Sequence, residues 1–282
     1  MNWKVYYLVF VALLVTSYSN SQSNLLNAIE VDQIGKQSKE KIAADNDTPL
    51  SYGYIDDRDI LWSKVVWEFV DLNQKINLPY YYPIDTANIS NDRRSLFDTL
   101  LKGIRKGDIK NVYSDSFFTS KITGSEINEK LVNIRLNGDY PDTFRIQTQD
   151  IEGYMMKGMW YFDKRLGELK YRLLALCPVT PEARDAGNEK ADVIDLFWVY
   201  FPTVRDILHE SKAFNDKNSA MPITFDHLLN SRRFNGQIYK EENVYGDREI
   251  QQYMKDNSQN QLLESERVKE KIRDFESDMW NY

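Results

Sequence analysis

The stretch MWYFDKRLGELKYRLLALC, residues 159–177, decides the class of the fold. Its two apolar and aromatic segments, 159–162 and 170–177, flank the turn-like sequence RLGE at 165–168. Strand-forming residues on both sides of a glycine-containing turn predict a β-hairpin. Cys177, the single cysteine of the chain, ends this hairpin in an apolar context. A lone cysteine cannot form an intrachain disulfide, so we interpret it as a small buried hydrophobe.

Helical patterns dominate the chain after this hairpin. A short strand is expected at 196–201, followed by helices at 203–210 and 224–233. The highly charged tail at 248–280 is also expected to be helical. Its last turns carry four apolar residues at spacings of 4, 3 and 4, namely Val268, Ile272, Phe275 and Met279. This narrow seam predicts docking on another helix, either in the same domain or in a neighbouring subunit.

Three more helices are expected before the hairpin, at 59–72, 95–106 and 125–136. The acidic cluster at 56–59 suits a helix start, where carboxylates accept hydrogen bonds from free backbone N–H groups. A metal site is the alternative for this cluster, but no glycine-containing calcium loop follows it. Gly107 supplies a natural end to the second helix.

The helix expected at 59–72 has only one narrow polar stripe, formed by Lys64, Glu68 and Asp71. Its remaining residues are apolar or aromatic, which predicts burial on most sides. The next segment, LPYYYP at 78–83, has a proline at each end, which favours an extended conformation. Alternating side chains would leave at least one tyrosine ring exposed. The segment is then an edge strand packed on the core, an interface, or a sugar-stacking surface.

Two short motifs recur in the same order along the chain. The sequence FDTLL at 97–101 is echoed by FDHLL at 225–229, and NVYSD at 111–115 is echoed by NVYGD at 243–247. The offsets between the copies are 128 and 132, so they agree within a short insertion. This matched order predicts two related α+β units. Chance similarity of short motifs is the alternative.

The first 21 residues have the order of a secretory signal peptide. Lys4 gives a positive start, residues 5–15 are uncharged and mostly apolar, and residues 16–22 are small and polar. Cleavage is expected after Ser21, with an uncleaved anchor or a buried helix as the alternative. The apolar stretch is short of the roughly 20 residues that span a bilayer. No cysteine follows it for lipid attachment, so we expect membrane association only through a partner.

The fold class predicted from these patterns is α+β, with several helices and short antiparallel strands and hairpins. Residues 1–21 are expected to be the signal peptide and residues 22–50 a flexible polar arm. The first α+β unit is then 51–180, and the second, with the charged C-terminal helix, is 181–282.

Composition and motifs argue against most enzyme classes. A net charge of −7 disfavours nucleic acid, whose phosphates need a basic surface. The chain contains no HExxH, GxSxG, GxGxxG or P-loop sequence. Its only histidines, His209 and His227, lie in separate predicted helices, which argues against a zinc site. We therefore assign no catalytic, metal-binding or cofactor-binding residue. No pair of carboxylates stands out, although a glycosidase of unfamiliar type stays open.

The chain resembles the gliding-motility family GldN, which is similar to PorN in secreting bacteria that do not glide. The resemblance is carried by DILWSKVVWE at 59–68, by NLPYYYP at 77–83, by 95–108 and by 158–178. It covers the chain from about Ile55 to the C-terminal helix and rests on the order of these segments, because the family has no short catalytic signature.

This resemblance implies a non-catalytic periplasmic subunit of the type IX secretion system. Such a subunit would form a ring of like neighbours with an outer-membrane lipoprotein, called GldK or PorK. The periplasmic part of the motor protein GldM or PorM would contact that ring. The protein would then associate peripherally with the outer membrane, without inserting into it.

Aromatic residues and the C-terminal seam are our candidates for the contacts of such a subunit: Trp62, Trp67, Tyr80, Tyr81, Tyr82, Val268, Ile272, Phe275 and Met279. Aromatic side chains make up 13% of the chain, and they serve interfaces as well as cores. The alternative function is an exported carbohydrate- or surface-binding protein that uses exposed aromatic rings.

Overall fold

The structure is a computed structural model that describes residues 48–84, 93–137, 140–182, 193–215, 223–255 and 257–280. The expected signal peptide and nearly all of the expected arm at 22–50 lie outside the described residues. The helices and strands of the described part belong to one compact unit, Pro49–Thr86 with Arg93–Tyr282.

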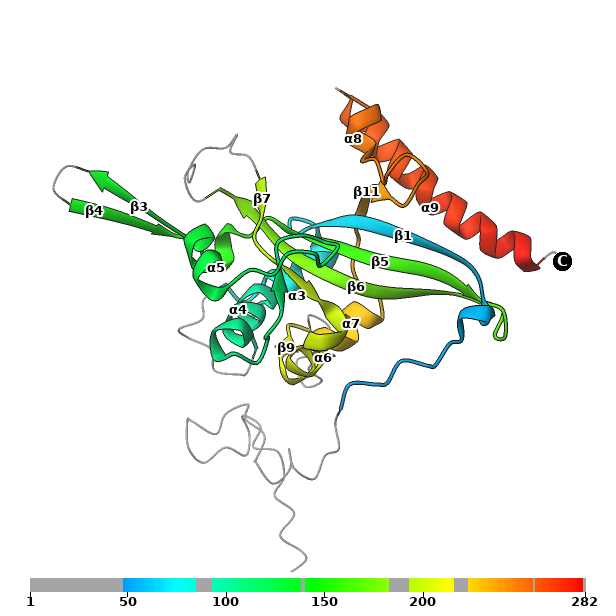
Figure 1. Cartoon of the computed structure of the whole chain (residues 1–282), viewed down its shortest axis with the longest axis horizontal. Helices are drawn as coiled ribbons and strands as arrows, with labels where there is room; N and C mark the ends of the chain where they lie inside the picture. Colours follow the sequence, from blue (N-terminus) through cyan, green and yellow to red (C-terminus); the bar gives the residue numbers. More distant parts are fainter. Residues whose placement is uncertain are drawn as a thin grey trace, which may run out of the picture. The chain divides into compact units, whose positions relative to one another are not determined.

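A seven-stranded antiparallel sheet forms the centre of this unit (Figure 1). Its strand order is β11-β1-β5-β6-β8-β2, and β7 pairs with β6 beside that path. The strands are β1 (Ile60–Asp71), β2 (Val112–Tyr113), β5 (Gly153–Asp163), β6 (Glu168–Pro181), β7 (Val193–Asp195), β8 (Trp198–Tyr200) and β11 (Gln237–Glu241). Strands from both sides of residue 180 therefore share one sheet.

The remaining elements are two small strand pairs, the helices and short 3₁₀ turns. Two small antiparallel pairs are β3 (Val132–Asn137) with β4 (Tyr140–Arg145), and β9 (Lys212–Ala213) with β10 (Ile223–Thr224). The helices are α3 (Leu78–Tyr81), α4 (Leu96–Lys106), α5 (Gly124–Leu131), α6 (Phe201–Glu210), α7 (Phe225–Asn230), α8 (Ile250–Tyr253) and α9 (Ser258–Trp280). Short 3₁₀ turns occur at Asp57–Asp59, Lys75–Asn77 and Thr148–Asp150. The α+β class predicted from the sequence is confirmed.

The strongest local signals in the sequence are also confirmed. Strands β5 and β6 form the predicted hairpin, in which Asp163 pairs with Glu168 and Gly167 adopts a positive φ of 63°. Helix α4 begins after Ser95, whose hydroxyl accepts a hydrogen bond from the Asp98 N–H at 3.2 Å. It ends at Gly107 with φ at 81°, a left-handed conformation that glycine adopts without steric cost.

The helix predicted at 59–72 is wrong, because these residues form strand β1. The strand is central, paired with β5 on one side and β11 on the other, and its middle is buried on both faces. A strand buried on both faces has a continuous apolar sequence that resembles a buried helix, and its valines favour the strand. The apparent polar stripe has a different origin: Lys64 and Glu68 each have an ion-pair partner far along the chain.

The extended conformation predicted for LPYYYP is also wrong. Residues 75–81 form a 3₁₀ turn followed by the short helix α3. Pro79 lies in the first turn of α3, where the missing N–H has no intrahelical partner to lose. The helix ends before Pro83, so the two prolines bound a helical turn.

Other boundaries also differ from the prediction. The helix expected at 125–136 ends at Leu131, where the β-branched Val132 begins strand β3. Phe201, expected in a strand, starts helix α6, with Pro202 in its first turn. The C-terminal helix is interrupted between α8 and α9.

The apolar core is divided into three clusters. The largest fills the space between the sheet and helices α3 to α7, with Tyr80, Phe97 and Phe225 among its largest fully buried side chains. A second cluster lies beneath α9. The third contains Trp67, Ala175, Cys177 and Trp198. Because side chains alternate along a strand, Val66 contacts α9 while Trp67 points to the opposite face of β1.

The repeated motifs do not occupy equivalent structures. In the first copy of the NVY motif, Val112 is buried in strand β2. In the second, Val244 lies in a turn and is 93% exposed. The two FDxLL copies both start helices, but Phe97 is the second residue of α4 and Phe225 is the first of α7. The division at residue 180 into related units stays a prediction that rests on the sequence echoes.

Candidate functional site

The predicted seam of the C-terminal helix packs against the same chain. Val268 and Ile272 are buried against Val66 of β1 and Ile238 of β11. Phe275 stacks on Trp62, and Met279 is half-buried near the end of α9. The structure shows docking within the domain, but the predicted helical partner is wrong, because the seam packs on strands β1 and β11.

The predicted tyrosine group is divided between the core and the surface. Tyr80 is fully buried, its hydroxyl donates to the Arg233 carbonyl at 3.2 Å, and burial raises its pKa above the ordinary value. The Tyr81 hydroxyl donates to the Gln149 carbonyl at 3.1 Å. Tyr82 meets Tyr81 edge-on and leaves 44% of its surface exposed. Tyr82 is therefore the member of this group with most surface to offer a partner.

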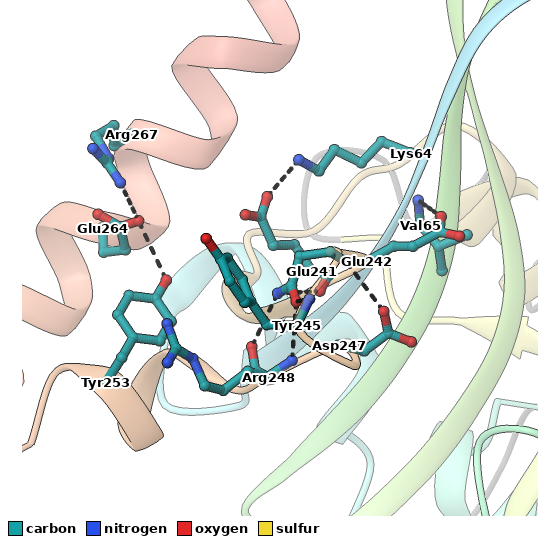
Figure 2. A network of polar contacts seen from close by, with 11 residues as sticks. Lys64, Val65, Glu241, Glu242, Tyr245, Asp247, Arg248, Tyr253, Glu264 and Arg267 are labelled. Carbon is teal, nitrogen blue, oxygen red and sulfur yellow. Dashed lines mark hydrogen bonds and ion pairs between the residues drawn. The ribbon is translucent and has the colours of Figure 1, made fainter.

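A network of polar contacts joins β1, β11, the following loop, α8 and α9 (Figure 2). The Lys64 ammonium lies 2.7 Å from the Glu241 carboxylate across the β1–β11 pair. Glu264, on α9, accepts hydrogen bonds from the Tyr253 hydroxyl at 3.2 Å and from Arg267 at 2.6 Å. These contacts fix both ends of the loop that runs from residue 242 to 249.

Hydrogen bonds within the loop at 242–249 give it a defined shape. The Asn243 side-chain oxygen accepts from the Tyr245 N–H at 2.9 Å, and the Asp247 carboxylate accepts from the Asn243 N–H at 3.1 Å. The Glu242 N–H donates to the Val65 carbonyl at 2.9 Å. The tip of the loop nevertheless exposes 93% of Val244 and 74% of Tyr245. We call these two residues the apolar tip.

A second shaped loop, at 114–120, follows β2. The Asp115 carboxylate accepts hydrogen bonds from the Thr119 hydroxyl at 2.6 Å and from the backbone N–H groups of Phe117, Thr119 and Ser120. The hydrogen bond from Thr119, followed by those from the backbone, lowers the pKa of Asp115 to about 2. Phe118 has a positive φ of 61° and packs on Tyr113, whereas Phe117 is 51% exposed.

Two lysines flank the buried ring of Trp67 beside these loops. Trp67 pairs with Lys157 on β5 and with Lys240 on β11, so the three residues are cross-strand neighbours. The Lys157 and Lys240 ammonium groups lie 4.9 and 4.8 Å from the Trp67 ring centroid. They also lie 4.5 and 5.2 Å from the centroid of Phe117. We call Trp67, Phe117, Lys157 and Lys240 the lysine–tryptophan face.

The second loop is tied directly to this face. The Trp67 indole N–H donates to the Ser116 hydroxyl at 3.0 Å, and the Lys157 ammonium donates to the Ser116 carbonyl at 3.0 Å. Burial lowers the pKa of Lys157, and the positive charge of Lys240 lowers it further. The pKa of Lys157 is raised by the carboxylates of Asp247, Glu242 and Asp115. Side chains of both loops therefore lie near its ammonium group.

The lysine–tryptophan face and the apolar tip combine cationic and apolar groups. This surface offers two ammonium groups, an exposed phenyl ring and an apolar tip held on pre-shaped loops. In the part of the chain that the structure describes, no three His, Cys, Asp or Glu side chains converge in a metal-binding geometry. None of its helices is both long and apolar enough to span a bilayer.

Sequence reasoning found one member of the lysine–tryptophan face, Trp67, and missed the others. Lys157 and Lys240 are 83 positions apart in the numbering, and only strand register brings them to one ring. Sequence reasoning considers Val244 and Tyr245 only as part of the NVYGD echo of 111–115, which gives no signal of an exposed tip. The glycine and aspartate that follow Tyr245 are common turn residues and were the available signal.

Comparison with known proteins gives one family. The family model described as gliding motility associated protein GldN matches residues 55–281. No curated protein matches the chain.

Proposed function

The chain belongs to the GldN family of gliding motility associated proteins, and from this premise we propose that it is a non-catalytic periplasmic subunit of the type IX secretion and gliding machinery. We propose that it forms a ring with an outer-membrane lipoprotein resembling GldK or PorK. A motor protein resembling GldM or PorM would contact the ring through its periplasmic part. The observation that carries the proposal is the family match over residues 55–281, which includes every helix and strand of the described structure.

Two surface loops support a role in assembly. The loops at 114–120 and 242–249 expose Phe117, Val244 and Tyr245, although internal hydrogen bonds hold their backbones. Loops shaped before binding lose little conformational entropy when a partner docks. Exposed aromatic rings on such loops are typical of interface anchors. We therefore place a partner contact at the lysine–tryptophan face and the apolar tip.

A ring of identical subunits needs two different surfaces on each copy, because neighbours meet head to tail. The outward side of α9 is our candidate for the second surface, since it exposes Leu262 and Leu263. The inward side of α9 is already occupied by its contact with β1 and β11. Contacts at the loops and at α9 would then serve different neighbours.

The test is the native mass of the mature protein, measured alone and after co-expression with the outer-membrane lipoprotein of the same cell. We expect a large complex of fixed stoichiometry with the lipoprotein, and loss of secretion and gliding when the gene is deleted. The proposal would be contradicted if the protein is a stable monomer that does not bind the lipoprotein and if cells without the gene still secrete. Screens for glycan binding would then test the alternative of a carbohydrate-binding protein with exposed aromatic rings.

A further inference from the structure

We propose that Lys157 and Lys240 bind carboxylates of an acidic, partly apolar segment of a protein partner. The inference rests on the proposed function and deepens it, because it names the chemistry that the partner presents to the lysine–tryptophan face.

Strand register places Lys157 and Lys240 on either side of the Trp67 ring. Lys157 of β5 and Lys240 of β11 are the direct cross-strand partners of Trp67, and the β1–β11 pairing shifts register just beyond this point, between Trp67 and Glu68. Such bulges re-aim side chains relative to regular alternation. Here Tyr239 and Lys240 both turn to the face of Trp67, where Tyr239 joins the third cluster. The result is two like charges at nearly equal distances from one indole ring.

Neither of these ammonium groups has a carboxylate at ion-pair distance among the described residues. Three other partly buried cations are paired with carboxylates, namely Lys64 with Glu241, Arg205 with Asp226, and Arg232 with Glu68. Two partly desolvated charges that repel each other cost free energy unless an anion approaches them. The aromatic rings offset part of that cost, but a carboxylate between the two lysines would interact with both.

The nearby acidic residues are engaged in shaping the loops. The Asp115 carboxylate accepts four hydrogen bonds within its own loop. Asp247 accepts from the Asn243 N–H, and Glu242 accepts from the Val65 N–H at 3.4 Å. These carboxylates act on Lys157 from a distance but do not neutralise it by contact. They would also repel a dense polyanion, which favours isolated carboxylates on a peptide.

The apolar part of the site favours a protein segment over a small anion. Phe117 lies over both lysines and remains half-exposed. The loop that carries Glu242 and Asp247 also carries the apolar tip. A segment with acidic side chains beside apolar ones would pair with the lysines and cover these rings.

The experiment uses the full chain, free and in its complex with the co-expressed lipoprotein. A carbodiimide couples amines to carboxylates that touch them, and mass spectrometry then identifies the linked residues. We expect Lys157 or Lys240 to be linked to an aspartate or glutamate of a partner protein in the complex. We also expect both lysines to react less with an acetylating reagent in the complex than in the free chain.

Variants give a second readout. K157M/K240M should weaken partner affinity at least tenfold, whereas K110M, at an exposed lysine outside this face, should leave it unchanged. K240M alone should keep or raise the melting temperature, because it removes a like charge from beside Lys157. The inference is overturned if the complex forms but both lysines acetylate as in the free chain and K157M/K240M binds the partner with unchanged affinity. The proposed function then still stands. Absence of any complex overturns both.

Discussion

The indole of Trp62 and the phenyl ring of Phe275 stack with their centroids 4.7 Å apart and their planes at 21°. Trp62 lies on β1, and Phe275 lies on α9 one turn beyond the buried pair Val268 and Ile272. Phe162 of β5 completes the contact by meeting Phe275 edge-on at 6.1 Å. The stack therefore extends the attachment of α9 beyond its buried centre, toward the C-terminal end.

Phe275→Ala should weaken the docking of α9. The variant loses a half-buried ring and its stacking contact with Trp62, which should lower the free energy of unfolding by about 2 kcal/mol. Urea unfolding measures the loss, and hydrogen exchange of residues 270–280 should increase. Arg273→Ala, at an exposed position of the same helix, is the control. Equal stability of the two variants would show that the stack does not hold the helix.

Asp115 should control the order of the loop at 114–120. Its folded-state pKa is about 2, below the ordinary 3.8, so its ionised form stabilises the loop. That contribution is fully present above pH 4 and is lost as the pH falls from about 4 to about 2. The amide resonances of Phe117, Thr119 and Ser120 should therefore titrate with a midpoint near 2.

Asp115→Asn should remove this titration and speed amide exchange in the loop at every pH, because a neutral amide accepts these hydrogen bonds more weakly. Thr119→Val removes only the strongest bond and should have a smaller effect. Amide resonances of the wild type that titrate near 3.8 would contradict the structure of this loop.

Arg205 and Asp226 form a buried two-point ion pair that also holds the segment before β1. The Arg205 guanidinium contacts the Asp226 carboxylate at 2.7 and 3.1 Å, donates to the Leu50 carbonyl at 2.6 Å and lies over Tyr52. Arg205→Ala leaves the carboxylate buried without its cation and should cost about 3 kcal/mol of unfolding free energy. Arg205→Lys keeps the charge but loses the two-point contact, so an intermediate loss is expected.

The double variant Arg205→Ala/Asp226→Ala supplies the check on this pair. Its loss should be smaller than the sum of the two single losses, because each single change already breaks the ion pair. Chemical denaturation of the four proteins gives the coupling free energy. Strict additivity would mean that the pair contributes nothing to stability.

What the sequence revealed depended on how local each signal was. Ser95 and Gly107 act on the backbone of their own helix, and the hairpin turn joins adjacent strands, so these elements were predicted. Glu68 is buried in β1, whereas its spacing from Lys64 and Asp71 predicts the polar stripe of a helix. The ion-pair partner of Glu68, Arg232, is 164 residues away, so no local sequence pattern predicts this contact.

The residues of the candidate site are likewise brought together by contacts between distant parts of the sequence. Trp67 is a candidate by its residue type alone, but the proposed site also needs Lys157 and Lys240, which strand register brings to its ring. Register among non-adjacent strands is a property of the whole sheet. The sequence therefore indicated the family and the class of fold, whereas the binding chemistry became visible only with the tertiary structure.

Tyr245→Ala tests the apolar tip as a contact for a partner. The ring is 74% exposed, so its removal should change the free energy of unfolding by less than about 0.5 kcal/mol. If the tip anchors a partner, the same change should weaken affinity about tenfold or more, since aromatic anchors carry a large share of interface energy. Leu166→Ala, at an exposed leucine in the β5–β6 turn, is the matched control. Native mass and affinity are measured for both variants with the co-expressed lipoprotein and, separately, with the periplasmic part of the motor. A selective loss with one of the two assigns the tip to that neighbour, and equal behaviour of both variants with each partner would remove the tip from the interface.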